Sequence, residues 1–250
     1  MNRWRGAIAG VGAYALALVA LAPATWVDAG LQRASDGRLR LAEARGTLWS
    51  GSGRIEIRDT GGRTGVAGNL AWRVAPESLV RGRLVCDVAL EQAARRFPVT
   101  LSLSRFELAN ADITLPAAAL GLGLPELAPL ELTGEVQLKV SSLSIERGAA
   151  RGSATLQWRA AGSALSPVAP LGDYELRLEG DGPAVRAILQ TLQGPIRLEG
   201  KGSWTHGDGP SFLAVARVPA QHQAQLAPLL RLIAVERGDG SFELQQLQLK

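Results

Sequence analysis

Few residues of this chain are of the types that perform chemistry. The best candidates for metal binding or nucleophilic attack are two histidines, His206 and His222, and one cysteine, Cys86. Neither histidine has a Cys or a carboxylate at metal-ligand spacing, so each is predicted to be a surface or turn residue. Cys86 lies within the strand-like run 84–88, which predicts a small buried hydrophobe. A single cysteine also excludes an intramolecular disulfide.

The sequence motifs of common enzyme classes do not occur in this chain. It contains no G-x-S-x-G elbow, no Walker loop and no G-x-G-x-x-G after a strand, and the nearest approach, Gly121-Leu122-Gly123, lacks the third glycine. We therefore predict no catalytic residue, no cofactor, no metal and no enzyme activity. The remaining means of function are surfaces, such as sheet edges and apolar faces that recruit another chain.

Composition indicates an ordered globular protein. Of its 250 residues 46% are hydrophobic and 20% are charged, and aromatic residues make up only 5%. The 27 basic residues exceed the 23 acidic ones by four, but the arginines are scattered among Asp and Glu. No nucleic-acid partner is predicted, because such a partner requires a clustered basic surface.

The N-terminus carries the pattern of a membrane anchor. Arg3 and Arg5 precede the run 6–22, which has no charged residue, and Trp4 and Trp26 flank it. A helix from one Trp to the other spans roughly 33 Å, close to a bilayer core with its interfacial belts. These two arginines and two tryptophans are the predicted residues of the membrane interface.

The positive-inside rule then gives the topology. Residues 1–5 are a cytoplasmic tail, 6–26 a single transmembrane anchor, and 27–250 a β-rich domain outside the cytoplasm. A cleaved signal peptide is the rival interpretation, because Ala22-Pro23-Ala24 has the small-x-small form of a cleavage site. No lipobox cysteine follows the apolar run, which excludes a lipoprotein.

After the anchor, alternation of polar and apolar residues with period two dominates the chain. Gly- or Pro-containing turn signals separate the alternating runs, which indicates an antiparallel sheet with one solvated face. The clearest runs are 38–41, 54–58, 99–104, 135–140, 174–179 and 242–249. The fold is therefore predicted to be mainly β.

Three segments depart from simple alternation. Residues 184–193 have apolar residues at helical spacing, but Gly-Pro pairs on both sides confine them to strand length, and we interpret them as a strand. Residues 221–234 are the best candidate for a short C-terminal helix, although Pro228 would kink it. Residues 117–124 are predicted to be a short helical or irregular crossover.

The sequence also echoes itself at a separation of 86 residues. Aligning 70–90 with 156–176 gives seven identities, among them Trp72-Arg73 with Trp158-Arg159. We interpret these four residues as anchors of two related halves, 39–111 and 130–202, joined side by side in one curved sheet. Chance similarity in a chain rich in Ala, Leu and Arg is the alternative.

One glycine-rich stretch stands out just beyond the anchor. In 44–53, five of ten residues are Gly or Ser, and Trp49 is the one aromatic side chain. We predict a short strand over 46–49 that enters a glycine-rich bend, with Trp49 as a core anchor.

These features together resemble the type II secretion system protein N family. The most specific element is Gly46-Thr47-Leu48-Trp49-Ser50-Gly51, placed just after an anchor that ends in Pro23-Ala24-Thr25-Trp26-Val27. Weaker echoes follow at 70–74, 196–204 and 226–230. The family is defined by pattern, so the six residues of the motif are structural and no active-site residue is carried over.

The resemblance implies a place and a role. The protein would be an accessory or scaffold component of the general secretion pathway, single-pass in the bacterial inner membrane, with a periplasmic β-rich domain. It would act in the export of folded proteins through the envelope of Gram-negative bacteria. Its partners would be the inner-membrane platform, with the secretin or its connecting protein as further candidates.

An alternative of another class is a periplasmic lipid-handling protein. A single anchor followed by a curved sheet with an apolar inner face also resembles AsmA-type envelope proteins. A continuous open apolar groove would favour lipid, whereas a core closed by 221–234 would favour scaffolding.

Overall fold

The computed structural model describes most of the chain beyond the N-terminal segment. The described residues are 14, 17–58, 64–123, 125–205, 211–223, 225–226, 234–237 and 241–244. They form two compact units, Met1–Glu91 and Gln92–Lys250. Each unit is built on an antiparallel sheet, so the prediction of a mainly β, antiparallel protein is confirmed.

The predicted anchor falls largely outside this part of the chain. Residues 1–13, 15 and 16 lie outside the described residues, and no helix among the described ones is long and apolar enough to cross a membrane. Residues 17–20 are helical, a turn follows at Leu21, and Pro23 forms an isolated bridge with Thr47. The helix predicted to run through residue 26 is therefore interrupted at 21–24, where proline has no amide proton to continue it.

From residue 25 on, the described part of the first unit holds one helix, one 3-10 turn and four strands in sequential order. Its elements are α2 (Thr25–Ala34), β1 (Leu39–Gly46), β2 (Ser50–Arg58), β3 (Thr64–Ala75), η1 (Pro76–Arg81) and β4 (Arg83–Leu90). All three pairings, β1-β2, β2-β3 and β3-β4, are antiparallel. Asp36 and Gly37, in the turn before β1, both have positive φ.

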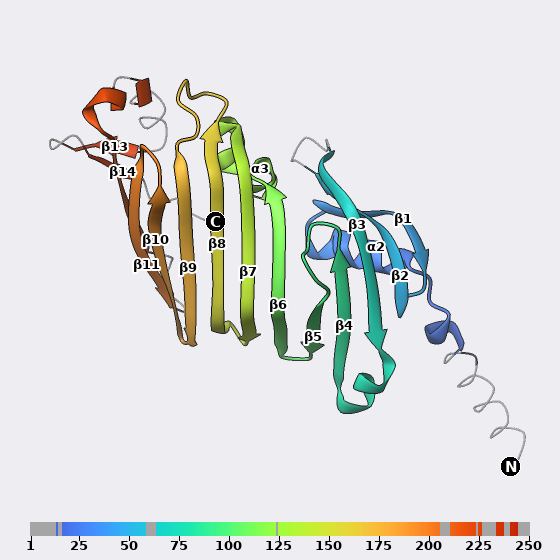
Figure 1. The fold of residues 1–250 in the computed structure, drawn as a ribbon. Helices are drawn as coiled ribbons and strands as arrows, with labels where there is room; N and C mark the ends of the chain where they lie inside the picture. The colour runs from blue at the N-terminus through green and yellow to red at the C-terminus, as the bar shows by residue number, and fades with distance from the viewer. Residues whose placement is uncertain are drawn as a thin grey trace, which may run out of the picture. The chain divides into compact units, whose positions relative to one another are not determined.

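Helix α2 covers one face of this sheet, as Figure 1 shows, and closes the core. The buried side chains are Ala24, Leu41, Leu70, Trp72 and Val74. The same helix also protects the edge of β1. The Asp28 carboxylate accepts the Leu41 N–H at 2.7 Å, and the Ser35 hydroxyl accepts the Leu39 N–H at 2.9 Å. These two edge amides are therefore not available to an added strand.

The second unit holds ten strands among its described residues. The elements are β5 (Phe97–Ser102), β6 (Arg105–Pro116), α3 (Ala118–Gly123), η2 (Pro125–Leu130), β7 (Leu132–Glu146), β8 (Ala149–Ser163), β9 (Gly172–Gly182), β10 (Ala184–Gln193), β11 (Arg197–Thr205), β12 (Ser211–Arg217), β13 (Ala234–Glu236) and β14 (Phe242–Leu244). Strands β5 to β12 lie side by side in chain order, and β14 then β13 complete the edge (Figure 1).

The strand register divides the residues of this sheet into a polar and an apolar face. One cross-strand row is polar, and the row one residue along is apolar. The polar row is Gln137, Gln157, Glu175 and Gln190. The apolar row is Leu138, Leu156, Leu176 and Leu189. The period-two alternation of the sequence is the direct cause of this separation.

A cluster of buried apolar side chains closes the C-terminal end of the apolar face. Its members are Leu171, Ile196, Ala216, Leu226, Ala234 and Phe242. Residues 220–223 and 225–226 are helical, so the predicted C-terminal helix exists there, but Ala234 belongs to β13 and not to the helix. The hydrogen bonds of β13 with β14 hold Ala234 in the sheet. The rest of the predicted helix lies outside the described residues.

Two of the segments that depart from simple alternation adopt the predicted structures. Residues 184–193 form strand β10 and residues 118–123 form helix α3, which confirms both predictions. The boundary between the compact units, at residue 91, falls inside the first predicted half, 39–111. The division into the halves 39–111 and 130–202 stays a prediction.

Candidate functional site

The glycine-rich motif forms the turn between β1 and β2. Gly46 ends β1 with φ of +92°, and a Cβ there would lie 2.5 Å from the Ser50 carbonyl oxygen. The Thr47 N–H donates to that same oxygen at 2.9 Å. The Thr47 hydroxyl oxygen accepts the N–H groups of Trp49 at 3.3 Å and Ser50 at 3.2 Å. A glycine followed by threonine therefore fixes this turn.

The predicted order of strand and bend is wrong at this place. The expectation was a strand over 46–49 and a bend over the following glycines, whereas residues 47–49 form the turn and Ser50 begins β2. The physical reason is the threonine hydroxyl, which satisfies two amides of the turn. Gly51 and Gly53 lie within β2, where they leave room for neighbouring side chains.

The turn holds the segment that follows the apolar N-terminal run. The Leu48 N–H donates to the Ala22 carbonyl at 2.8 Å, and the Ala24 N–H donates to the Gly46 carbonyl at 3.2 Å. Ala22 and Ala24 are almost completely buried. The indole N–H of Trp49 donates to the Val19 carbonyl at 2.9 Å. Residues 19–24 are therefore fastened to the sheet by both backbone and side chain.

Trp49 lies at the margin of the core, half-buried, and packs against the cluster of the first unit. Trp72 occupies the centre of that cluster, with only 7% of its surface exposed. Its indole N–H donates to the Leu48 carbonyl at 3.0 Å. A Cβ on Gly51 would lie 2.5 Å from the Trp72 ring, so glycine is required there. The structure thus brings Trp72 into contact with the motif.

The other predicted repeat anchors lie away from the turn. Trp158, half-buried, donates its indole N–H to the Thr133 carbonyl at 2.9 Å, and its ring meets that of Tyr174 at 6.1 Å between centroids. Arg73 is exposed, and Asp87 is the residue opposite it in the pairing of β3 with β4. Arg159 is exposed, and its guanidinium donates to the Gln157 amide oxygen at 3.2 Å.

The description "type II secretion system protein N" belongs to the family model that matches residues 37–245. The chain belongs to this family. The match spans most of the chain and includes the whole motif turn, which confirms the family resemblance. No curated protein and no solved structure matched the chain in the corresponding searches. None of the three comparisons supports the alternative of a lipid-handling protein.

In this protein N family member the predicted membrane-interface residues are only partly described. Arg3, Trp4 and Arg5 lie outside the described residues. Trp26 stands in the first turn of α2, and 61% of its surface is exposed.

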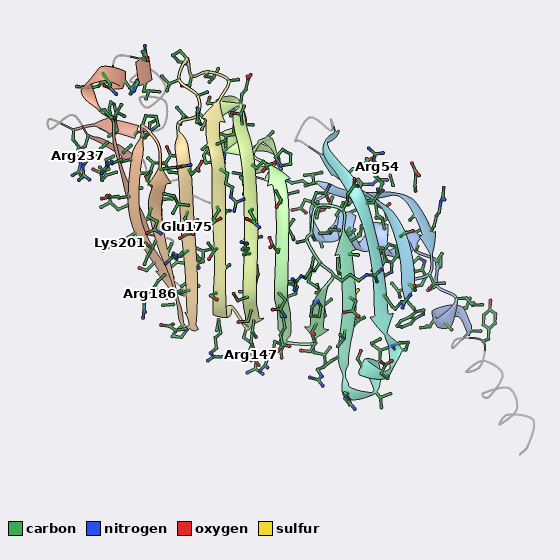
Figure 2. The ribbon with its side chains drawn as sticks, in the orientation of Figure 1. Arg54, Arg147, Glu175, Arg186, Lys201 and Arg237 are labelled. Atoms are coloured by element: carbon green, nitrogen blue, oxygen red, sulfur yellow. The ribbon has the colours of Figure 1, made fainter. Side chains whose placement is uncertain are left out.

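The sequence reasoning missed a buried carboxylate in the second unit. Glu175, labelled on β9 in Figure 2, is only 5% exposed although it lies on the polar face. It accepts hydrogen bonds from Gln157 at 2.7 Å, Gln190 at 2.9 Å and Arg177 at 2.7 Å. The bond from Gln157 is the largest cause that lowers the pKa of Glu175, and burial opposes it. In the sequence, Glu175 is one polar residue in an alternating run, and only the register shows its neighbours.

A groove on the polar face of the first unit was also missed. It has a volume of about 500 Å³, its floor includes Ser52, Ala71 and Ala89, and Arg45 and Arg54 border it. Figure 2 labels Arg54 on this unit. The small floor residues lie on three neighbouring strands, so only their pairing could reveal the groove.

The residues first considered for chemistry are not assembled into a reactive centre where the structure describes them. Among the described residues there is no group of three or more His, Cys, Asp and Glu that could hold a metal ion. Cys86 is half-buried in β4, and burial raises the pKa of its thiol, which keeps it protonated at neutral pH. His206 lies outside the described residues, and His222 is beside Gln221 at 3.2 Å.

Proposed function

We propose that this chain is a non-enzymatic scaffold of the type II secretion machinery, anchored in the inner membrane by the N-terminal apolar segment that precedes residues 19–24. Residues 27–250 would lie in the periplasm, where the sheets present surfaces to other components during the export of folded proteins. The inner-membrane platform is the first candidate partner, and the secretin or its connecting protein is the next. Family membership supports the general role in secretion.

One observation carries the scaffold proposal. The motif turn binds residues 19–24 through three hydrogen bonds, from Leu48, Ala24 and Trp49. A segment held in this way is not a flexible linker, because its backbone is paired with the sheet. A membrane anchor preceding it would therefore fix the position of the first unit at the membrane. A fixed position is what a scaffold between membrane components requires.

The proposal can be tested by complementation of a host strain that lacks this chain. We expect the wild-type chain to restore export and Gly46→Val to abolish it, because a side chain at Gly46 would collide with the Ser50 carbonyl. Gly30→Ala is the matched control, since a Cβ at Gly30 meets nothing within 4 Å. Measurements are the exported protein in the medium and the amount of variant in the membrane fraction.

A pull-down separates the scaffold role from other roles. The full-length tagged chain, crosslinked in its host membrane, should recover components of the secretion platform. Gly46→Val should lose them while Gly30→Ala retains them. Recovery of lipid with no secretion component, or normal export in the strain that lacks the chain, would contradict the proposal.

A further inference from the structure

The tip of the β3–β4 hairpin holds two apolar side chains out of the protein. In η1, Val80 is 91% exposed and Leu79 is 41% exposed. Single exposed apolar side chains are common on soluble proteins, so the informative feature here is that two adjacent ones share one hairpin tip. Two adjacent ones at a tip that the fold itself constructs point to a contact.

The tip is constructed by specific hydrogen bonds. Ser78 is buried, and its hydroxyl donates to the Ala75 carbonyl at 2.6 Å and accepts the Val85 N–H at 3.1 Å. The Gly82 N–H returns to the Leu79 carbonyl at 2.9 Å, with Gly82 in the left-handed region at φ of +66°. These hydrogen bonds fix the turn in a conformation in which Val80 is almost fully exposed and Leu79 is partly exposed.

Two basic residues accompany the apolar pair. Arg81 and Arg83 are exposed, and neither forms an ion pair or hydrogen bond through its side chain within the described part of the chain. Glu77 is the one acidic residue of η1. This combination suits the surface of a bilayer, where apolar side chains enter the acyl boundary and guanidinium groups contact the anionic headgroups.

The tip lies at the end of the first unit where the N-terminal segment enters. The Val74 N–H, one residue before the end of β3, donates to the Trp49 carbonyl at 2.7 Å. Trp49 in turn holds Val19. Figure 1 shows η1 at the foot of β3 and β4, at the end of this unit to which the N-terminal segment is attached. Leu21, next to that segment, is itself 74% exposed.

We propose that the β3–β4 tip docks on the surface of an anionic bilayer, the one that the N-terminal segment enters, with Leu79 and Val80 at the acyl boundary. Arg81 and Arg83 contact the headgroup phosphates. The first unit then has two contacts with the membrane, which fix its orientation as well as its distance. This inference rests on the proposed membrane anchoring, because the anchor brings the tip to the bilayer.

An environment-sensitive fluorophore at position 80 tests the docking. The full-length chain carries Cys86→Ala to remove the native thiol and Val80→Cys for labelling, and is reconstituted in vesicles of phosphatidylcholine mixed with phosphatidylglycerol. Spin-labelled lipid is the quencher. We expect quenching and a blue shift at position 80, because the label replaces an exposed apolar side chain at the bilayer. Replacing Arg81 and Arg83 by Gln should weaken the contact by about fivefold for each arginine.

Two further label positions make the result decisive. Leu21→Cys reports on the anchor, and Ala34→Cys, exposed at the far end of α2, is the control that should remain unquenched. Quenching at position 21 without quenching at position 80 would overturn the docking and leave the anchoring intact. No quenching at either position would overturn both. Equal quenching at position 80 in phosphatidylcholine alone would overturn the selectivity for anionic lipid.

Discussion

The β3–β4 hairpin of the first unit and the β8–β9 hairpin of the second have the same register at a separation of 86 residues. Leu70 pairs with Leu90 as Leu156 pairs with Leu176, and Trp72 pairs with Val88 as Trp158 pairs with Tyr174. In each hairpin the tryptophan indole donates to a carbonyl in an earlier strand or turn, of Leu48 or Thr133. The sequence echo therefore corresponds to a shared local structure, which supports the proposal of related halves.

The two tryptophans differ because the residues opposite them differ. Across the strand from Trp72 stands Gly51, and across from Trp158 stands Val136. Glycine lets the Trp72 ring lie against the backbone and become buried, whereas Trp158 stays half-exposed and tilts onto Tyr174. The absence of a side chain at Gly51 thus leaves room for the Trp72 ring in the core.

The polar faces of the two hairpins differ as well. Ala71 and Ala89 form part of the floor of the groove in the first unit. The positions 86 residues later are Gln157 and Glu175, which hydrogen-bond to each other at 2.7 Å. A pair of long polar side chains thus occupies the face that is hollow in the first unit. The shared register preserves the apolar face, while the polar face is free to diverge.

Removing each tryptophan should give the largest effect. We expect Trp72→Ala to lower the free energy of unfolding by about 3–5 kcal/mol, because it leaves a cavity in the core. Trp158→Ala should cost less, about 2 kcal/mol, because its ring is half-exposed. Chemical denaturation of the full-length chain measures the loss, and hydrogen exchange locates it. A larger loss for Trp158 than for Trp72 would refute the assignment of Trp72 as the core anchor.

Making the first hairpin resemble the second at one position should have the next largest effect. Gly51→Val gives Trp72 the neighbour that Trp158 has, and we expect a loss of about 1–3 kcal/mol as the ring is displaced. Gly30→Ala is the control, expected to stabilise α2 by up to about 1 kcal/mol. Near-ultraviolet circular dichroism reports the tryptophan environment. An unchanged spectrum and stability for Gly51→Val would show that the ring does not need the glycine.

The Glu175 cluster should give the second unit a response to acid. Its pKa is lowered in the folded state, so its contribution to stability is present above the ordinary carboxyl pKa, about 4.3, and is lost as pH falls through the lower folded value. We expect Glu175→Gln to destabilise the unit at neutral pH and to flatten its pH dependence below about pH 4. Glu179→Gln, exposed on the same strand and face, is the control. Equal behaviour of both variants would contradict this role of the cluster.

Filling the groove should have the smallest effect on stability. The double change Ala71→Gln and Ala89→Glu places the polar pair of the second hairpin in the first. Because both positions face away from the core, we expect a change within about 0.5 kcal/mol by denaturation. A loss well above 1 kcal/mol would show that the polar faces of the hairpins are not interchangeable. A loss of export without a loss of stability would assign a partner contact to the groove.

Local sequence signals predicted most of the fold. Alternation between polar and apolar residues identified the strands, since a half-buried strand must follow it, and the glycine-proline pairs around 184–193 correctly favoured a strand over a helix. The predicted order of strand and turn at 46–51 was wrong. The abundant glycines of 51–53 suggested a bend there, whereas the hydrogen bonds to the Thr47 hydroxyl place the turn at 47–49. The C-terminal helix was extended too far, because apolar spacing continues where Ala234 joins a strand.

The candidate site could be predicted only in part. The motif Gly46–Gly51 was identified by sequence, and so was Trp72, but their contact was not, since it depends on the pairing of β2 with β3. Three other features depend on segments that are far apart in the chain. They are the hydrogen bonds to Ala22 and Val19, the exposure of Val80 and the burial of Glu175. No local pattern contains such information.

By itself the sequence determined the class of fold, the family and the position of the motif, because alternation, turn residues and motif spacing are local properties of the chain. The tertiary structure alone decided what the motif does. Strand pairing places Gly51 against the Trp72 ring, and the turn of Thr47 against Ala22–Ala24. The physical reason is that register is a relation between strands, and it is fixed only when the whole apolar face is buried or covered.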